Sequence, residues 1–390
     1  MFHRYLLIIV SCLLAGILFA QADTLSLPLP QFSNPFYDSF SRNYIGTTAA
    51  GRGYTGVSFR GDIDNALLNP ASVVPDSSQV FVELNIKPSL EAYGYPLYAN
   101  YTSSIPIGLM GVSIPVDDKF TFGMLYNVPK SITLEDFSFF INQGADIIQR
   151  FPTYSLHQAT ALIALHSGPL HLGLDLHNQL HYIDDPIYLR TYERIRKSKY
   201  CLRLQPGIIY QLGPANIGFS MMPETKFNWN LKYANYDFLM PLWLTGGIGI
   251  NKSDYTFAAE AEWEQTSKIC DDFDDHYTLK AGFEKIKGKT TYRLGYLFSS
   301  NVYSGMIHLG QNTVNPDTIN AWNSVPTAVF IEDNAQHSVT AGLSYRHKNG
   351  TLNFALMQVI MGDVKKTQIN LSLSLYLSSI FRNKEYPLNE

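Results

Sequence analysis

The stretch PLHLGLDLHNQLHYI, residues 169–183, alternates between two kinds of side chain. One set is apolar and the other is polar or small: Leu170, Leu172, Leu174, Leu176, Leu180 and Tyr182 against His171, Gly173, Asp175, His177, Gln179 and His181. Successive side chains of a β-strand point to opposite faces, so this stretch predicts a strand with one apolar and one polar face. DYTFAAEAEWEQ (254–265) and TQINLSLSLYLSSIF (367–381) repeat the pattern.

Alternation also occurs in soluble β-sandwiches, so strand length and the composition of the polar face must decide. Many of these strands run about 10 to 13 residues, close to the span of a tilted transmembrane strand. Their polar faces, rich in Ser, Asn, Glu, His and Tyr, suit a barrel that is apolar toward lipid and polar toward its lumen. The sequence predicts about fourteen strands, an even number as in single-chain bacterial barrels: 79–87, 106–116, 119–128, 154–167, 169–183, 198–212, 214–222, 239–251, 254–265, 276–286, 289–300, 336–347, 350–361 and 367–381.

The connections fall into two classes. Those at 167–169, 213–214 and 348–350 are tight, whereas 129–153, 184–197, 223–238 and 301–335 are long. Short turns at one end and long loops at the other are typical of outer-membrane barrels. Within the first long connection, 136–151 has apolar residues at helical spacing and predicts an amphipathic helix, which either packs on the barrel mouth or captures apolar ligand.

Residues 1–22 have the form of a secretory signal peptide: a short positive head, an apolar run and Ala20-Gln21-Ala22 as a small-x-small cleavage site. The alternative is a retained membrane anchor, for which the run is short. The predicted organisation is a signal peptide (1–22), an N-terminal plug (23–78), a barrel (79–381) and a polar tail (382–390). The net charge of −4 gives no reason to expect a nucleic-acid partner. Cys201 and Cys270 would remain after cleavage, and we expect them to be unpaired, with a single bridge as the alternative.

The hexapeptide GRGYTG (51–56) matches G-x-G-x-x-G. A dinucleotide site also needs a buried strand before the glycines, a helix after them and an acidic residue about 20 positions further on. The surrounding sequence meets none of these conditions convincingly, because Ser, Asn and aromatic residues precede the motif and a glycine and a proline follow it. No cofactor is therefore predicted.

The longer stretch AAGRGYTGVSFRGDIDNALLNPAS (49–72) resembles the plug signature of the FadL-type long-chain fatty-acid transporters of bacterial outer membranes. The resemblance implies a segment folded into the lumen of a barrel and passive uptake of hydrophobic molecules such as long-chain fatty acids. It is also similar to PorV-type barrels, which assist secretion and surface attachment, so a scaffold with a secretion-system partner is the alternative. The residues that carry the signature are Gly51, Arg52, Gly53, Tyr54, Gly56, Asp62, Asp64, Asn69, Pro70 and Ala71. We expect a monomer in the lipid bilayer of the outer membrane, with a hydrophobic small molecule as ligand.

A band of charge is predicted on the lumen side of adjacent strands, because a Lys or Arg facing mid-membrane lipid would cost about 2–4 kcal/mol. It comprises Glu260, Glu262, Lys280 and Arg293, and ion pairing that stiffens the barrel is its expected role. His171, His177 and His181 share the lumen face but lie too far apart along the strand to hold one metal ion. No nucleophile elbow is present, so we expect no enzyme and no metal site.

Two features break the barrel pattern. Pro129 has no N–H for the ladder, so Asn127-Val128-Pro129 predicts either a kink in the third strand or the end of that strand. In the FadL-type family a kink in the third strand forms a lateral gate, and the resemblance makes Asn127 and Pro129 candidates for one. Phe381 suits the aromatic residue on which barrels commonly end, and the nine residues after it are expected to be a dispensable periplasmic tail.

Overall fold

The computed structural model describes residues 42–377 apart from 62, 74–77, 94–97, 103–105, 136, 142–145, 151–152, 190, 231–234, 270–273, 303–306, 309–327, 330–334 and 363. The predicted signal peptide, the first part of the predicted plug, Phe381 and the polar tail lie outside these residues. So do Asp62 and Cys270, whereas Cys201 is described and buried.

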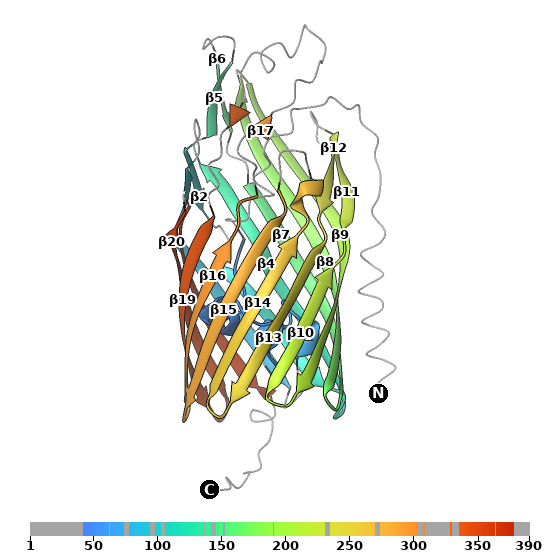
Figure 1. Ribbon diagram of the computed structural model, residues 1–390. Coiled ribbons are helices and arrows are strands. Elements are labelled where there is room, and N and C mark those ends of the chain that lie inside the picture. The colour runs from blue at the N-terminus through green and yellow to red at the C-terminus, as the bar shows by residue number, and fades with distance from the viewer. Residues whose placement is uncertain are drawn as a thin grey trace.

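Fourteen antiparallel strands form a closed ring in which each pairs with its two neighbours and the last pairs with the first. Figure 1 shows the barrel from the side. In order around the ring the strands are β1 (Gln79–Tyr93), β3 (Ile107–Pro115), β4 (Phe120–Glu135), β7 (Thr153–Ser167), β8 (Leu170–Leu189), β9 (Thr191–Leu212), β10 (Ala215–Met222), β13 (Trp243–Lys252), β14 (Tyr255–Glu264), β15 (His276–Lys287), β16 (Thr290–Ser299), β19 (Gln336–His347), β20 (Gly350–Met361) and β21 (Val364–Tyr376). Each overlaps one predicted strand, although β1, β4, β8 and β9 extend several residues beyond the predicted bounds, and the predicted fold class is confirmed.

The two faces of the wall are sorted as the alternation predicts. On β8, Leu172, Leu174 and Leu180 are about two-fifths exposed on the outside, while His177 and Gln179 are buried on the inside. Large exposed apolar side chains occur on every strand of the ring. The barrel is therefore apolar outside and polar inside, the reverse of a soluble protein.

Aromatic residues gather at the two ends of the apolar band. Near the tight turns lie Phe120, Tyr210, Tyr255, Tyr292 and Tyr345, all exposed, and toward the other end lie Tyr200 and Tyr277. Tyr200 and Tyr210 are about ten residues apart on β9, or about 33 Å at about 3.3 Å per residue. A strand tilt of about 40° reduces this distance to about 25 Å along the barrel axis, the height of the apolar band of outer-membrane barrels.

The long connections contain strands rather than plain loops. β5 (Phe137–Ile141) pairs with β6 (Asp146–Arg150), β11 (Thr225–Asn230) with β12 (Asn235–Met240), and β17 (Ile307–His308) with β18 (Ala328–Val329). The predicted helix over 136–151 is wrong, because Phe140 lies opposite Ile147 across a hairpin. The predicted loop at 184–197 is also wrong, because β8 and β9 stay paired as far as Leu189 and Thr191. Figure 1 shows β5, β6, β11, β12 and β17 at the end of the barrel away from the tight turns.

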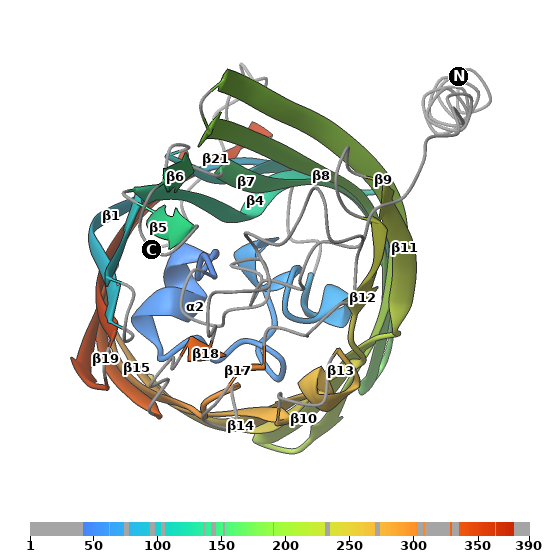
Figure 2. The same ribbon diagram turned by 90° about the horizontal axis from the view of Figure 1, so that it is seen from above.

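The chain from residue 42 to residue 73, hereafter the inner segment, lies inside the ring, as the view down the barrel shows (Figure 2). It contains a short helix α2 (Thr47–Gly51) and two 3-10 turns, η1 (Ile63–Asn65) and η2 (Pro70–Ser72). Its apolar residues Ile45, Ile63, Ala66 and Val73 join buried wall residues in one cluster. Within the described residues no helix has the length and apolar character needed to cross a bilayer.

Candidate functional site

Two carboxylates hold the start of α2. The first N–H groups of a helix have no partner inside the helix and favour negative charge. Glu83 on β1 accepts hydrogen bonds from Gly46 N at 3.0 Å and Thr47 Oγ1 at 2.8 Å, and Asp64 accepts one from Thr48 N at 2.8 Å. Asp64 therefore caps a helix 16 residues before it rather than closing a local turn. Glu83 belongs to the wall and was missed in the sequence, where it is one charged residue among many.

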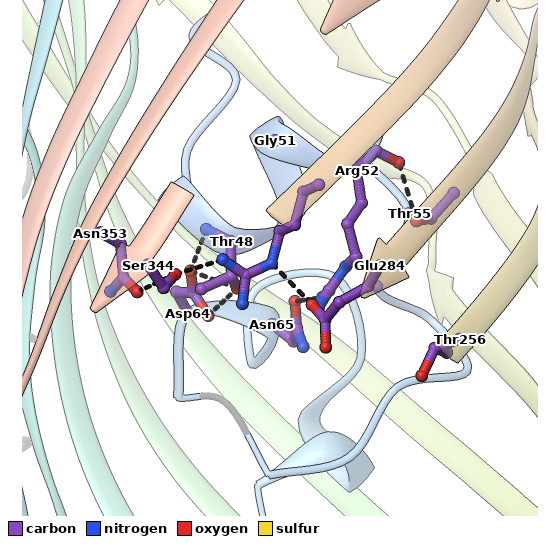
Figure 3. A network of polar contacts seen from close by, with 12 residues as sticks. Thr48, Gly51, Arg52, Thr55, Asp64, Asn65, Thr256, Glu284, Ser344 and Asn353 are labelled. Atoms are coloured by element: carbon purple, nitrogen blue, oxygen red, sulfur yellow. Dashed lines mark hydrogen bonds and ion pairs between the residues drawn. The ribbon is translucent and has the colours of Figure 1, made fainter. Parts of the chain in front are cut away.

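Arg52 of the signature ties the inner segment to the wall through the network drawn in Figure 3. Its guanidinium donates to Glu284 Oε2 on β15 at 2.9 Å and to Asn65 Oδ1 at 3.2 Å. Arg293 on β16 donates to the same Glu284 oxygen at 2.6 Å and also to Ser344 on β19. Arg52 is only 1% exposed. One largely covered carboxylate, 12% exposed, therefore joins two arginines, one from the inner segment and one from the wall.

Glycines of the wall lie against the inner segment, five of them facing its backbone and Gly207 facing the side chains of Asn69 and Pro70. A Cβ added at any of them would overlap atoms of the inner segment, because the two chains approach too closely to admit one. Gly295 faces Gly53 N, Gly218 faces the Val57 carbonyl, and Gly342 faces the Cα of Gly51. The set, hereafter the glycine belt, comprises Gly173, Gly207, Gly218, Gly282, Gly295 and Gly342 on β8, β9, β10, β15, β16 and β19.

The sequence did carry a signal for the glycine belt. Each of its glycines occupies an inward position of an alternating strand, as Gly173 does between His171 and Asp175. Only the signature glycines Gly51, Gly53 and Gly56 were singled out in the sequence, although Gly51 and Gly53 have their contact partners on the wall.

The Asn69-Pro70-Ala71 motif docks on two of these glycines. Asn69 accepts from Ala71 N at 3.0 Å and so caps η2, and its amide donates to the Val57 carbonyl at 2.7 Å and the Ile208 carbonyl at 3.1 Å. Gly173 and Gly207, paired across β8 and β9, leave room for this motif. The motif therefore links two parts of the inner segment to the wall.

The predicted charge band faces inward. Lys280 lies 2.5 Å from Glu262, both side chains are 1% exposed, and Arg42 of the inner segment donates to Glu262 at 2.7 Å. Glu260 lies opposite Lys280 in the ladder but accepts hydrogen bonds from Gly56 N and Val57 N, both at 2.8 Å. The band therefore binds the inner segment as well as linking strands to one another.

The histidines on the same inner face have separate partners. His171 Nδ1 lies 2.6 Å from His166 Nδ1, His177 lies between Thr160 and Gln205, and His181 Nδ1 lies 2.7 Å from the Tyr154 hydroxyl. The described part of the chain contains no group of three or more potential ligands that could hold a metal ion.

The wall is interrupted at Pro129. β4 continues through it to Glu135, so the alternative in which the strand ends at Val128 is wrong. The register between β4 and β7 shifts between Asn127 and Lys130. On its other side β4 pairs with β3 as far as Asn127 and with β2 (Tyr98–Thr102) only from Thr133, within the described residues. β1 also has a register shift, between Ile86 and Ser89.

The inner segment covers the backbone carbonyls at this bulge. Asn43 donates from its backbone N to the Pro129 carbonyl at 2.9 Å and from Nδ2 to the Val128 carbonyl at 2.6 Å. Buried carbonyls without a partner are costly, most of all at membrane depth. Asn43 lies just before the signature and was not singled out in the sequence.

A cavity of about 180 Å³ lies above the inner segment and reaches the bulge. Its apolar lining includes Ile45, Leu67, Leu156, Met222 and Trp243. Its polar lining includes Asn127, Gln158, Gln179, Arg203 and Glu264. Pro129 of the bulge also lines it. Both residues predicted for a lateral gate, Asn127 and Pro129, therefore line the same cavity.

Solved structures share this fold. No protein-family model and no curated protein match the sequence. The toluene transporter TodX of P. putida has a TM-score of 0.61 at 14% identity, over 87% of this chain and 99% of that one. The Ralstonia pickettii toluene transporter TbuX has 0.60 at 13%, over 86% and 98%. A Pseudomonas aeruginosa FadL homologue has 0.55 at 12%, over 84% and 97%. The resemblance predicted from residues 49–72 is thus confirmed as a likeness of fold.

Proposed function

We propose that this protein is a bacterial outer-membrane channel through which compact hydrophobic molecules pass passively, with the inner segment as its plug. The membrane location is supported by the exposed apolar outer face and by aromatic bands about 25 Å apart. The structural neighbours titled as toluene transporters support the class of cargo.

The observation that carries the proposal is the meeting of the cavity with the bulge at Pro129. A molecule in the cavity lies beside the one stretch of β4 whose pairing is interrupted on both sides within the described residues. Asn127 and Pro129 are then the edge of a lateral gate, and release is sideways into the bilayer. The glycine belt supports this route, because a plug in close contact with six strands is a poor candidate for displacement.

The size of the cavity favours compact cargo over an extended acyl chain. A cavity of about 150 Å³ in another protein is enough to bind benzene, and this one measures about 180 Å³. It also favours a channel over a PorV-like scaffold, for which a filled interior would suffice.

The test is Pro129→Val. Valine supplies the missing N–H and should let β4 pair with its neighbour across the bulge. We expect uptake of labelled toluene by cells with intact lipopolysaccharide to fall severalfold, while the barrel still folds, as judged by its heat-dependent shift on gels. Pro115→Val, at the end of β3 and away from the cavity, is the matched control. Unchanged uptake in the folded Pro129→Val protein would remove the gate from the proposal.

A further inference from the structure

Three polar side chains lie on the outer face of the wall beside the bulge. The Tyr126 hydroxyl is 2.7 Å from His157 Nδ1, and Ser155 Oγ is 3.1 Å from His157 Nε2. Their strand neighbours Asn127 and Gln158 line the cavity, so Tyr126 and His157 point the other way. His157 also lies opposite Leu180, which is 43% exposed on the outside.

These three residues, hereafter the outer polar cluster, occupy outward positions, and Ser155 among them is only 4% exposed. Outward polar pairs also occur elsewhere on the wall, Tyr200 with Asn178 and Tyr296 with His337, so what distinguishes this cluster is its place beside the bulge. Lower on the same strands the outward positions are apolar, with Met124 and Ile163 about half exposed. Polar groups on a lipid-facing wall cost free energy unless they serve a purpose or bond to one another. The outer polar cluster lies where the gate would open, next to the register shift between Asn127 and Lys130.

A chain of side-chain amides reaches the same place from inside. Gln179 donates to Gln158 Oε1 at 2.6 Å, and Gln158 donates to Asn127 Oδ1 at 3.2 Å. All three line the cavity. The amide chain therefore runs from the cavity wall to the bulge, and the outer polar cluster continues it on the other face.

Two carbonyl oxygens of the cavity lining lack donors. Asn43 Oδ1 and Gln179 Oε1 are buried and have no hydrogen-bond partner among the described residues. The Asn43 side-chain nitrogen donates to the Val128 carbonyl, so Asn43 Oδ1 points away from Val128. Both side chains are only 3% exposed. Neither oxygen is itself exposed to the cavity, so an O–H or N–H group of a ligand reaches it when the side chain rotates, and such a donor would then satisfy an acceptor that lacks one.

We propose that the cargo is a compact apolar molecule carrying one hydrogen-bond donor, such as a phenol, rather than a bare hydrocarbon. This inference rests on the proposed channel function. The donor group hydrogen-bonds first to Asn43 and Gln179 and then to the side-chain amides that lead to the bulge. On the outer face it hydrogen-bonds to His157, Tyr126 and Ser155. The apolar ring meanwhile stays against Leu156, Met222 and Trp243.

Phenol and toluene test the proposal, because they differ by a hydroxyl in place of a methyl. In cells with intact lipopolysaccharide, barrel-dependent uptake is measured as the excess over cells that lack the barrel. We expect it to be about threefold to tenfold faster for phenol than for toluene, which is the factor that one net hydrogen bond gives. The double variant Tyr126→Phe/His157→Leu and the variant Gln179→Met should each lower the ratio of phenol uptake to toluene uptake toward one. Tyr210→Phe is the control, because it removes an exposed tyrosine hydroxyl near the tight turns, away from the outer polar cluster.

The outcomes separate the two proposals. Toluene uptake equal to or faster than phenol uptake would overturn the donor-bearing cargo and leave the channel intact. Barrel-dependent uptake of neither compound would overturn both. Calorimetric titration of the detergent-solubilised protein gives a second reading that does not depend on expression: phenol should bind more tightly than toluene, and Gln179→Met should abolish the difference. Equal affinities in the unaltered protein would count against the inference.

Discussion

The two sides of the wall hold the inner segment in different ways. From β8 to β19 the inner segment lies close against the wall at the glycine belt, and carboxylates such as Glu260 and Glu284 add hydrogen bonds to it. From β21 through β1 to β4 the contact is made by long side chains, with Glu83, Gln368 and Asn370 reaching inward to residues 44–47. The glycines of β3 and β4, such as Gly111 and Gly123, face side chains of neighbouring strands and not the inner segment.

The two kinds of contact correspond to two roles, which are anchoring of the inner segment and the proposed passage of cargo. Where the glycine belt contacts the inner segment no free volume remains, so this side fixes the inner segment. The broken ladder lies on the other side, and the cavity extends from it to residues of β8, β9, β10 and β13, whose side-chain rotations can enlarge it without moving the backbone. Each variant below changes one side of the wall, and the measurements of folding, melting and uptake show whether the other side is affected.

The largest effect is expected from filling the glycine belt. Gly295→Val places a branched side chain where Gly53 N already lies, and overpacking against backbone costs about 3 kcal/mol or more. The variant should fail to give the heat-resistant folded form on gels. Gly246→Val on β13 is the control, since an added Cβ there meets nothing nearer than Phe219 Cδ2 at 3.9 Å. Normal folding of Gly295→Val would mean that the inner segment is not fixed on this side.

The charge band should matter for stability more than for passage. Lys280→Met leaves Glu262 buried with Arg42 as its remaining partner, and breaking a buried ion pair costs about 3–5 kcal/mol. We expect a clear fall in the melting temperature in detergent with little change in uptake per folded barrel.

Lys268→Met is the comparison for this loss. Its ion pair with Glu224 is half exposed on the lysine side, and such pairs contribute about 0–1 kcal/mol. Reduced transport by Lys280→Met with unchanged melting would assign the charge band to cargo selection instead.

A smaller change in stability with a larger change in transport is expected on the broken side. Asn43→Ala leaves the Val128 carbonyl without its donor, at a cost of about 1–3 kcal/mol. With the bulge less firmly covered, uptake of toluene, which has no hydrogen-bond donor for Asn43 to accept from, should rise while melting falls only slightly. Asn353→Ala on β20 removes a buried amide far from the cavity and should affect melting alone. Equal effects of the two variants on uptake would argue against coupling between Asn43 and the gate.

The sequence was sufficient for the barrel because lipid and lumen impose opposite demands on alternate residues. That signal ends where the strands leave the membrane, which is why the paired ends of β8 and β9 were expected to be a loop. The apolar residues of 136–151 fitted a helix, but Phe139 and Phe140 in fact oppose Ile148 and Ile147 across a hairpin. The contacts of the inner segment were out of reach, because Glu83 and Arg52 meet partners that only barrel closure brings near.

The smallest effect concerns the turn that joins β3 to β4 on the broken side. Asp117 accepts hydrogen bonds from Lys119 N at 2.7 Å and Phe120 N at 2.8 Å, and these donors lower the pKa of its carboxyl. A group whose pKa is lowered by folding stabilises the fold above its unfolded pKa, about 3.9 for Asp, and loses that contribution as the pH falls through the folded pKa. Because Asn resembles the protonated carboxyl, Asp117→Asn should melt slightly below the unaltered protein from pH 7 to about pH 5, and the gap should close below about pH 4. Asp118→Asn makes the same charge change in the same turn while leaving both N–H donors on Asp117, so it should retain the pH dependence of the unaltered protein. A gap that stays constant down to pH 3 would show that the charge of Asp117 does not stabilise the turn, and that this end of the broken side is held by its backbone pairing alone.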